Sequence, residues 1–417
     1  MKLTTRLVMS LTLICLSCAY ATGEANWPRF GGAGGDFTTQ EEGIPQEWAA
    51  NDVQWRADLG GVGQSVPVVW DKSIFLTSSE QTSDGKVARY VICLNRTDGK
   101  TLWKQQAATG PGEPLHKMNT WATPSCATDG ELVIAYFGPG GLHCYNVDGD
   151  HQWSLNPVAP SGAWGFAGSP IMLDDKVIQN CDGEGKSFLL AVNKKTGEEI
   201  WRTERKATPK GGWSTPIVID TGKRKELVLN GEFGVQGYDP VTGEDLWYCQ
   251  SFNGRGTPVP AYTNGLLVTV NGKPGDIYAV KPGGAGDVTK THMAWHTRRG
   301  GDRDLPSPVA VGDYVFTVSM KGIATMYDAA SGKELWKERL GGNFSATPFI
   351  AGGLIYALDE DGKTFVIRPG DELNVVAKNS LGDRSGEIFR ASATPSAGQV
   401  FIRSDAALYC VGPRGAE

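Results

Sequence analysis

Aromatic, amide and guanidinium side chains recur shortly before regularly spaced prolines in this sequence. Trp121, Trp213 and Arg255 each stand three residues before such a proline. Aromatic faces and guanidinium groups around one opening can hold a planar, polar or anionic ligand. The alternative is that these side chains pack on one another and cap that end of the fold. The candidate binding residues are Asn119, Trp121, Trp164, Trp213, Arg255, Arg303, Phe344 and Arg390.

No motif for covalent or metal chemistry accompanies these residues. The sequence has no recognisable nucleophile with a base, and no carboxylate pair at a readable spacing. His292 and His296 are four residues apart, but they flank Trp295 in a strand-like stretch, which favours structural roles over metal binding. We therefore predict no catalytic residue and no metal site.

Composition points to a folded protein with many turns. The 417 residues are 40% hydrophobic and 21% charged, which excludes a disordered chain. The 55 Gly, 23 Pro and 13 Trp residues indicate many short strands. A net charge of −6 argues against a nucleic-acid partner, because phosphate binding needs a concentrated basic surface. No run of 18 apolar residues follows residue 21, so we expect no transmembrane span.

The first 21 residues have the pattern of a signal peptide. The basic residues Lys2 and Arg6 precede a short apolar run, and Ala19 and Ala21 supply the small residues of a cleavage site. We expect export to the periplasm or cell envelope, with residues 22–52 as an N-terminal extension. The spacing of the remaining cysteines selects no disulfide pairing. These cysteines are Cys93, Cys126, Cys144, Cys181, Cys249 and Cys410.

A pattern recurs every 40–50 residues or so, which is the range of propeller blades. Each copy opens with a small residue, a proline and an apolar run. Two further strands and a Gly turn follow, and a Trp stands four residues after the Gly. The opening prolines are Pro67, Pro124, Pro170, Pro216, Pro258, Pro308, Pro348 and Pro395.

The Gly and Trp of each copy have separate structural roles. The Gly supplies the positive φ of a tight turn, and the Trp covers the seam between neighbouring blades. Trp295 takes this place after a longer turn, and we expect Val375 or Val376 to replace Trp in the seventh copy. The Gly–Trp pairs are Gly99/Trp103, Gly149/Trp153, Gly197/Trp201, Gly243/Trp247 and Gly332/Trp336.

The two ends of the repeat region complement each other. The copy that opens at Pro395 lacks an outer strand, whereas residues 53–57 form an outer-strand sequence without a blade. Pairing the two closes the ring and removes an exposed sheet edge. We therefore predict an all-β, eight-bladed β-propeller of four-stranded antiparallel blades over residues 53–412. Residues 413–417 form a tail, and we expect a monomer.

Two stretches resemble a known family. The segment from Ala191 to Trp201, AVNKKTGEEIW, resembles the tryptophan-docking motif of pyrroloquinoline-quinone (PQQ)-type propellers. The segment from Asn26 to Gly32, NWPRFGG, resembles the start of secreted bacterial PQQ-like repeat proteins. The resemblance covers residues 26–412. It implies the propeller fold more strongly than any activity, because this fold hosts dehydrogenases, sensor domains and the BamB-type assembly scaffold.

The resemblance leaves two main functions open. The first is a non-catalytic scaffold without a cofactor, which binds a protein partner or a small polar or anionic ligand on its funnel face. The alternative is a PQQ-dependent dehydrogenase of alcohols or sugars with bound calcium, in which Asp304 is the base and Asn119 or Asn343 a calcium ligand. Alcohol-oxidising quinoproteins have adjacent cysteines against the cofactor, and this sequence has no Cys-Cys pair. The scaffold is therefore our expectation.

One connection stands out by its length. From Trp103 to Pro124 the chain takes 21 steps, against 12 from Trp336 to Pro348. We interpret this connection as a lid or a partner contact, with ordinary variation in loop length as the alternative.

Overall fold

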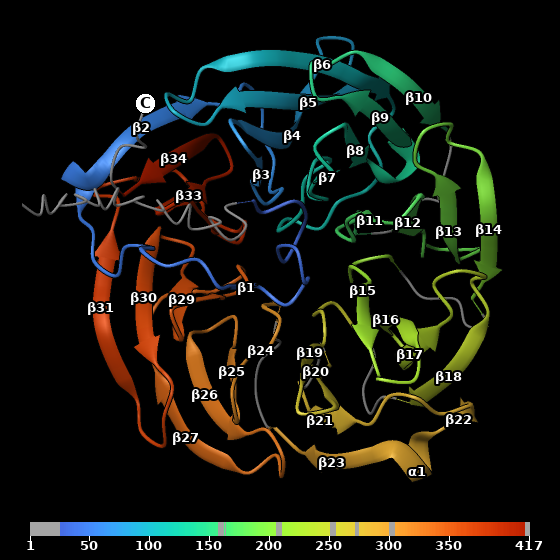
Figure 1. Cartoon of the computed structure of the whole chain (residues 1–417). Coiled ribbons are helices and arrows are strands. Elements are labelled where there is room, and N and C mark those ends of the chain that lie inside the picture. Colours follow the sequence, from blue (N-terminus) through green and yellow to red (C-terminus); the bar gives the residue numbers. More distant parts are fainter. Residues whose placement is uncertain are drawn as a thin grey trace, which may run out of the picture.

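A computed structural model describes residues 26–156, 162, 164–205, 211–250, 256–271, 275–299 and 305–412. Eight sheets surround a central axis like the blades of a propeller (Figure 1). Each blade has four antiparallel strands, which confirms the predicted fold. The predicted signal peptide and the tail at residues 413–417 lie outside the described residues.

The first four blades follow the chain from its inner strand outward. Blade 1 comprises β3 (Val68–Trp70), β4 (Ser73–Gln81), β5 (Val87–Asn95) and β6 (Thr101–Gly110). Blade 2 comprises β7 (Ala127–Thr128), β8 (Leu132–Tyr136), β9 (Leu142–Asn146) and β10 (His151–Leu155). Blade 3 comprises β11 (Ile171–Leu173), β12 (Lys176–Asn180), β13 (Phe188–Asn193) and β14 (Glu199–Glu204). Blade 4 comprises β15 (Ile217–Asp220), β16 (Lys225–Gly231), β17 (Gly234–Tyr238) and β18 (Asp245–Gln250), with β22 (Gly286–Asp287) added at its outer edge.

The other four blades complete the ring. Blade 5 comprises β19 (Ala261–Thr263), β20 (Leu266–Val270), β21 (Ile277–Val280) and β23 (Met293–Thr297), which follows the short α1 (Thr289–His292). Blade 6 comprises β24 (Val309–Val311), β25 (Tyr314–Val318), β26 (Ile323–Asp328) and β27 (Glu334–Arg339). Blade 7 comprises β28 (Phe349–Ala351), β29 (Leu354–Leu358), β30 (Lys363–Arg368) and β31 (Asn374–Ser380). Blade 8 comprises β32 (Thr394–Ser396), β33 (Gln399–Arg403), β34 (Ala407–Val411) and β2 (Val53–Asp58).

The repeated Gly and Trp residues join neighbouring blades as predicted. A side chain at Gly149 or Gly197 would meet the indole of Trp103 or Trp153 from the preceding blade at 2.8 Å. The indole N–H of Trp153 also donates to the Lys194 backbone oxygen at 2.9 Å. Only Gly lets the indole lie flat on the turn, and a positive φ at both Gly residues favours the same choice.

The N-terminal strand closes the ring, which confirms the closure prediction. Strand β2 pairs antiparallel with β34, and Trp55 of β2 lies against Gly99 of blade 1. The Trp55 indole N–H donates to the Arg96 oxygen at 3.1 Å. In Figure 1 the blue β2 lies beside the red β34, so both ends of the chain share blade 8.

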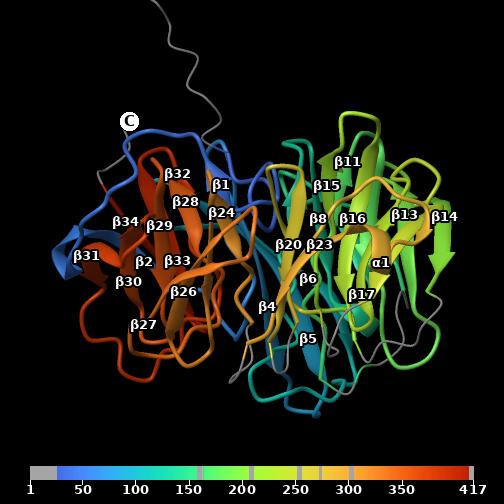
Figure 2. The ribbon, with the colours of Figure 1, turned by 90° about the horizontal axis from the view of Figure 1, so that it is seen from below.

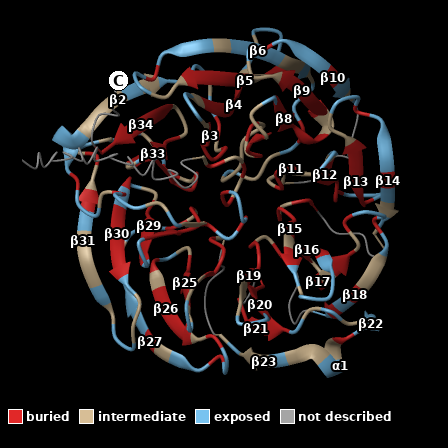
Figure 3. Ribbon diagram, in the orientation of Figure 1, coloured by how far each residue is buried: buried red, intermediate tan, exposed pale blue. Residues whose placement is uncertain are grey.

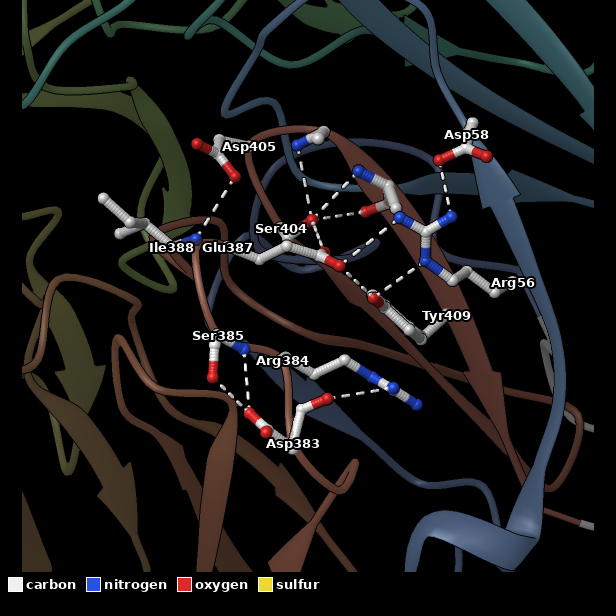
Figure 4. A network of polar contacts seen from close by, with 12 residues as sticks. Arg56, Asp58, Asp383, Arg384, Ser385, Glu387, Ile388, Ser404, Asp405 and Tyr409 are labelled. Carbon is white, nitrogen blue, oxygen red and sulfur yellow. Dashed lines mark hydrogen bonds and ion pairs between the residues drawn. The ribbon is translucent and has the colours of Figure 1, made fainter.

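A polar network links the closing strand to its neighbours (Figure 4). Arg56 of β2 donates to the Tyr409 hydroxyl of β34 at 3.0 Å, and that hydroxyl donates to Glu387 at 2.6 Å. Arg56 also pairs with Glu387 at 3.3 Å, and the Ser404 hydroxyl donates to the same carboxylate at 2.5 Å. This network ties β2 to β34 and to the connection between blades 7 and 8.

Blade 7 corrects one expectation. The seam position of its outer strand is Ala377, which faces Val366, and not Val375 or Val376. Trp48 of the N-terminal extension instead stacks on Tyr356 at 6.5 Å between ring centroids. Blade 8 is assembled from the two chain ends, so it has no continuous turn between its third and outer strands. The extension therefore supplies the aromatic side chain at this seam.

The N-terminal extension crosses one face of the ring (Figure 2). Trp27 forms a β-bridge with Val69 of blade 1, and β1 (Thr38–Thr39) pairs in parallel with β28 of blade 7. The main core lies in the inner and middle strands, whereas the residues of the outer strands are mostly half-buried or exposed (Figure 3). Within the described ranges, no helix has the length and apolar character needed to cross a membrane.

Candidate functional site

A pocket of about 300 Å³ opens where the connections between successive blades converge. Each connection runs from an outer strand to the next inner strand, so all eight reach the same face of the ring. Every one of them contributes at least one lining residue. One representative from each connection is Gln64, Asn119, Trp164, Trp213, Thr257, Leu305, Ser345 and Arg390.

The N-terminal extension also reaches this pocket. Phe30 contributes to its lining and packs edge-on against Phe37 at 5.0 Å. The extension is held by turns of the opposite face, where Asn26 accepts the Asp71 N–H at 2.8 Å and Glu41 accepts the Gly398 N–H at 2.6 Å. Phe30 therefore approaches the pocket from the far side of the central channel.

Two tryptophans form the aromatic wall of the pocket. The rings of Trp164 and Trp213 lie 5.7 Å apart at 38°. The Trp213 indole N–H donates to the Gly165 oxygen at 3.0 Å, and the Asn119 amide donates to the Trp164 oxygen at 2.9 Å. The first bond holds the Trp213 indole, and the second holds the backbone of Trp164, whose ring packs against Trp213. The wall is therefore built before any ligand arrives.

Arg390 lies opposite a carboxylate that balances its charge. Its Nε and the Glu360 Oε1 are 3.1 Å apart, and the Ser345 hydroxyl donates to the same oxygen at 2.5 Å. Arg390 and Ser345 line the pocket, whereas Glu360 is not among the lining residues. Arg390 therefore offers polar N–H groups to the pocket without a full unbalanced charge.

The remaining candidate residues lie elsewhere. Phe344 is fully buried and packs against Phe365 at 5.9 Å. The Trp121 indole donates to the Glu113 backbone oxygen at 3.0 Å and covers Gly112. Neither lines the pocket. Arg255 and Arg303, together with Asp304, lie outside the described residues.

The long connection after blade 1 is anchored at its start. Arg89 of β5 and Glu113 form an ion pair of 2.5 Å with both side chains almost fully buried. Much of the extra length between Trp103 and Pro124 is taken up by β6, which runs to Gly110. The ion pair holds the segment that leads from this strand to the pocket residues.

A ring of hydroxyl groups surrounds the channel beneath the pocket mouth. The eight blades share one register, and the residue two positions before its first inner-strand member is Ser or Thr in six blades. Each of these hydroxyls accepts the backbone N–H of the equivalent residue in the preceding blade at 2.8–3.0 Å. We call these residues the hydroxyl girdle: Ser125, Ser169, Thr215, Ser307, Thr347 and Ser392.

Two valines interrupt the hydroxyl girdle at blades 1 and 5. Val66 and Val259 donate their N–H groups but have no hydroxyl to accept one. In the sequence alone, this position is recognisable only as a small residue near the blade proline. The signal that was available is the recurrence of Ser or Thr beside the proline, as in Ser307-Pro308 and Thr347-Pro348.

Two buried guanidinium groups lie next to residues that line the pocket. Arg403 donates to the backbone oxygens of Ser65 at 3.0 Å and Thr77 at 2.8 Å. Arg29, next to Phe30, donates to the Ala33 oxygen at 3.3 Å. Burial lowers the pKa of Arg403 to about 9 and that of Arg29 to about 10, so both remain charged at neutral pH. Within the described ranges, neither has a carboxylate at ion-pair distance.

The described pocket residues do not fit a PQQ–calcium site. Calcium takes six to eight oxygen ligands or so, usually with carboxylates among them. No Asp or Glu is among the described lining residues, and the Asn119 side-chain oxygen already accepts from Thr120 and Thr123. The six predicted mature cysteines are all buried and unpaired. In the described part of the chain, no cluster of His, Cys, Asp or Glu could hold a metal.

A known family model matches most of this chain. The family model described as outer membrane protein assembly factor BamB matches residues 46–178, 87–280 and 231–373. These overlapping matches span most of the propeller. The chain belongs to this BamB family.

Curated relatives of this BamB-family chain differ in what they are named for. BamB of Burkholderia pseudomallei is 25% identical over 282 residues, which are 65% of this chain and 67% of the relative. Tetrathionate hydrolase of Acidithiobacillus ferrooxidans is 25% identical, over 64% of this chain and 53% of its own length. Quinoprotein alcohol dehydrogenase PedH of Pseudomonas putida is 37% identical, but over only 23% of this chain and 18% of its own.

Solved structures support the fold alone. BamB from Moraxella catarrhalis has a TM-score of 0.58 at 14% identity, over 87% of this chain and 97% of its own. The quinohemoprotein alcohol dehydrogenase ADHIIG from Pseudomonas putida HK5 has a TM-score of 0.67 at 13% identity, over 94% of this chain and 81% of its own. At such identities, a shared propeller does not transfer an activity.

Proposed function

We propose that this BamB-family chain is a non-catalytic binding scaffold of the bacterial cell envelope, which acts as a monomer and holds a protein partner on its pocket face. The observation that carries this proposal is the pocket itself. Its described lining combines two packed tryptophans with hydroxyl and amide groups, with His116, and with Arg390, whose charge is balanced by Glu360. Such a lining is equipped to bind, and within the described residues it contains no carboxylate that could act as a base.

Exposed apolar residues around the pocket provide the surface for a partner. Phe233 lies in the turn from β16 to β17 and is 49% exposed. Val62 and Ile388 lie in connections between blades and are also exposed. Turns of this kind and the blade connections share one face of a propeller, so the three side chains lie on the face where the pocket opens.

Photo-crosslinking in cells tests the proposal. Benzoylphenylalanine at Phe233 or Ile388 should give adducts of defined mass with an envelope protein. Val241 is the matched control, because it is 64% exposed but lies in a turn of the opposite face. The identified partner, once purified, should bind the mature chain and lose affinity when Trp164 and Trp213 are both replaced by Ala. Equal adducts from Val241, or unchanged affinity of the double variant, would place the partner elsewhere.

The second candidate is a PQQ-dependent oxidoreductase. Its support is the 37% identity to PedH over 110 residues and the propeller shared with ADHIIG. The described residues of the pocket include no carboxylate that could serve as a calcium ligand of such a site. We therefore favour binding over catalysis.

A further inference from the structure

We propose that the pocket contains a binding site for an oxyanion group, formed by the four residues of the hydroxyl girdle that line it and suited to a carboxylate on a small apolar body. This inference goes beyond partner binding on the pocket face. Four girdle residues line the pocket, namely Ser125, Ser307, Thr347 and Ser392. All four residues are more than nine-tenths buried, so their hydroxyls are enclosed polar groups and not part of an exposed polar surface.

The bonding of the girdle makes its hydroxyls donors toward the pocket. A Ser or Thr hydroxyl has one hydrogen and two lone pairs. In each of these four residues, a backbone N–H of the preceding blade already occupies one lone pair. Within the described part of the chain, none of the four hydroxyl hydrogens has an acceptor. Ser307, Thr347 and Ser392 belong to the adjacent blades 6, 7 and 8, so their O–H groups can donate to a ligand oxygen on that side of the pocket, whereas Ser125 of blade 2 lies across the ring.

The local charge favours a negative ligand. The described lining has no carboxylate, and the Arg390 charge is balanced by Glu360 behind the pocket. Arg403 donates to Ser65, which lies between the lining residues Gln64 and Val66. The charge of Asp405 acts on it, but no carboxylate in the described ranges lies at ion-pair distance. A buried charge without a partner is costly, and an anion near it offsets that cost.

The aromatic wall selects the rest of the ligand. Trp164 and Trp213 line the same pocket, and Phe30 closes it from the other side. An oxyanion at the girdle therefore has apolar surface beside it. A free inorganic oxyanion would use only the hydroxyls, whereas a carboxylate on an apolar body would use the hydroxyls and the aromatic groups.

Titration of the mature chain with benzoate and with neutral benzamide tests the proposal, with tryptophan fluorescence and calorimetry as readouts. Both probes have the same ring, so their difference reports the oxyanion. Benzoate should bind at one site and at least about ten-fold more tightly than benzamide, because charge-assisted hydrogen bonds exceed neutral ones. Equal affinities, or no binding of benzoate, would overturn the proposal.

The girdle supplies its own matched controls. Thr347→Val and Ser392→Ala should each weaken benzoate binding by at least about ten-fold, the loss expected for one hydrogen bond to a charged group. Ser169 and Thr215 accept the same kind of backbone N–H but do not line the pocket. Ser169→Ala and Thr215→Val should therefore destabilise the fold similarly and leave benzoate affinity unchanged. If these two control variants lower the affinity for benzoate as much as Ser392→Ala does, the hydroxyl girdle has only a structural role.

Competition separates the two sources of an oxyanion. Displacement of benzoate by sulfate, phosphate or acetate at similar concentrations identifies the free oxyanion as sufficient. Displacement only by other apolar carboxylates identifies the apolar body as part of the ligand. The titration and the competition experiment do not include a protein partner. A negative result in them therefore leaves the partner proposal intact, and an absence of crosslinks leaves the oxyanion proposal intact.

Discussion

Trp48 stacks on Tyr356 with their ring planes 4° apart. The equivalent contacts in other blades are made by an outer-strand Trp of the same blade, as in Phe75–Trp103 at 6.0 Å and Phe316–Trp336 at 6.2 Å. The N-terminal part of the chain thus completes the ring twice, with β2 in blade 8 and with Trp48 of the extension at the seam of blade 7.

Replacing Trp48 by Ala should therefore cost as much as replacing a seam Trp within the repeats. Trp48 and Trp201 are both buried, and truncating such a side chain typically costs about 3–5 kcal/mol. Denaturant titration of both Ala variants measures this loss. Trp213→Ala is the control, because Trp213 is only half-buried at the pocket and should cost much less. A loss for Trp48→Ala no larger than that control would contradict the role assigned to Trp48.

Removal of residues 22–57 should open the ring. The truncated chain would lose β2 and Trp48 together, which exposes the edge of β34 and the seam of blade 7. Size-exclusion chromatography should show aggregation, or calorimetry a large fall in melting temperature. A monomeric truncated chain that melts with the mature protein would show that closure is dispensable.

The closing network makes stability depend on pH through Glu387. Burial alone would raise the pKa of this carboxyl, but hydrogen bonds from Ser404, Tyr409 and Arg56 lower it below its ordinary value. A carboxyl with a lowered pKa stabilises the fold above its unfolded pKa of about 4.3, and this contribution is lost as the pH falls through the folded value. The free energy of unfolding should thus be smaller for Glu387→Gln than for the wild type at neutral pH. Titrations near pH 3 should find a smaller difference; a constant difference would show that the charge of Glu387 is unimportant.

The Arg89–Glu113 pair should behave as a unit. Both side chains are almost fully buried, so either single change, Arg89→Met or Glu113→Leu, leaves one charge without its partner. Each single variant should lose about 3–5 kcal/mol, whereas the double variant should recover much of that loss. A double-mutant cycle by denaturant titration measures the coupling. Additive losses would mean that the pair does not hold the connection after blade 1.

Much of the ring could be predicted because its signals are local and repeated. The spacing between Gly197 and Trp201 recurs from blade to blade, and each copy encodes the same docking of an indole on a turn. Trp48 lies outside the repeats, so no spacing connected it to Tyr356. Its role follows only from the absence of a continuous turn in blade 8, which is a property of the closed ring.

The site was less predictable for a different physical reason. Trp213 and Trp121 have the same spacing to the next proline, yet Trp213 lines the pocket and Trp121 covers Gly112. In irregular connections, the direction of a side chain depends on local backbone bonds and not on a fixed period. The hydroxyl girdle does follow a register, but small residues near a proline also suit close packing, so their polar role emerges only from the bonds between blades.

An activity assay decides most directly between a binding scaffold and an oxidoreductase. It uses the mature chain with PQQ, Ca²⁺, an artificial electron acceptor and a panel of alcohols and aldoses. A non-catalytic scaffold should give no substrate-dependent reduction of the acceptor above a control without protein. PQQ-dependent turnover that is lost in Arg255→Ala or Asp304→Ala would contradict the scaffold proposal and establish the oxidoreductase alternative.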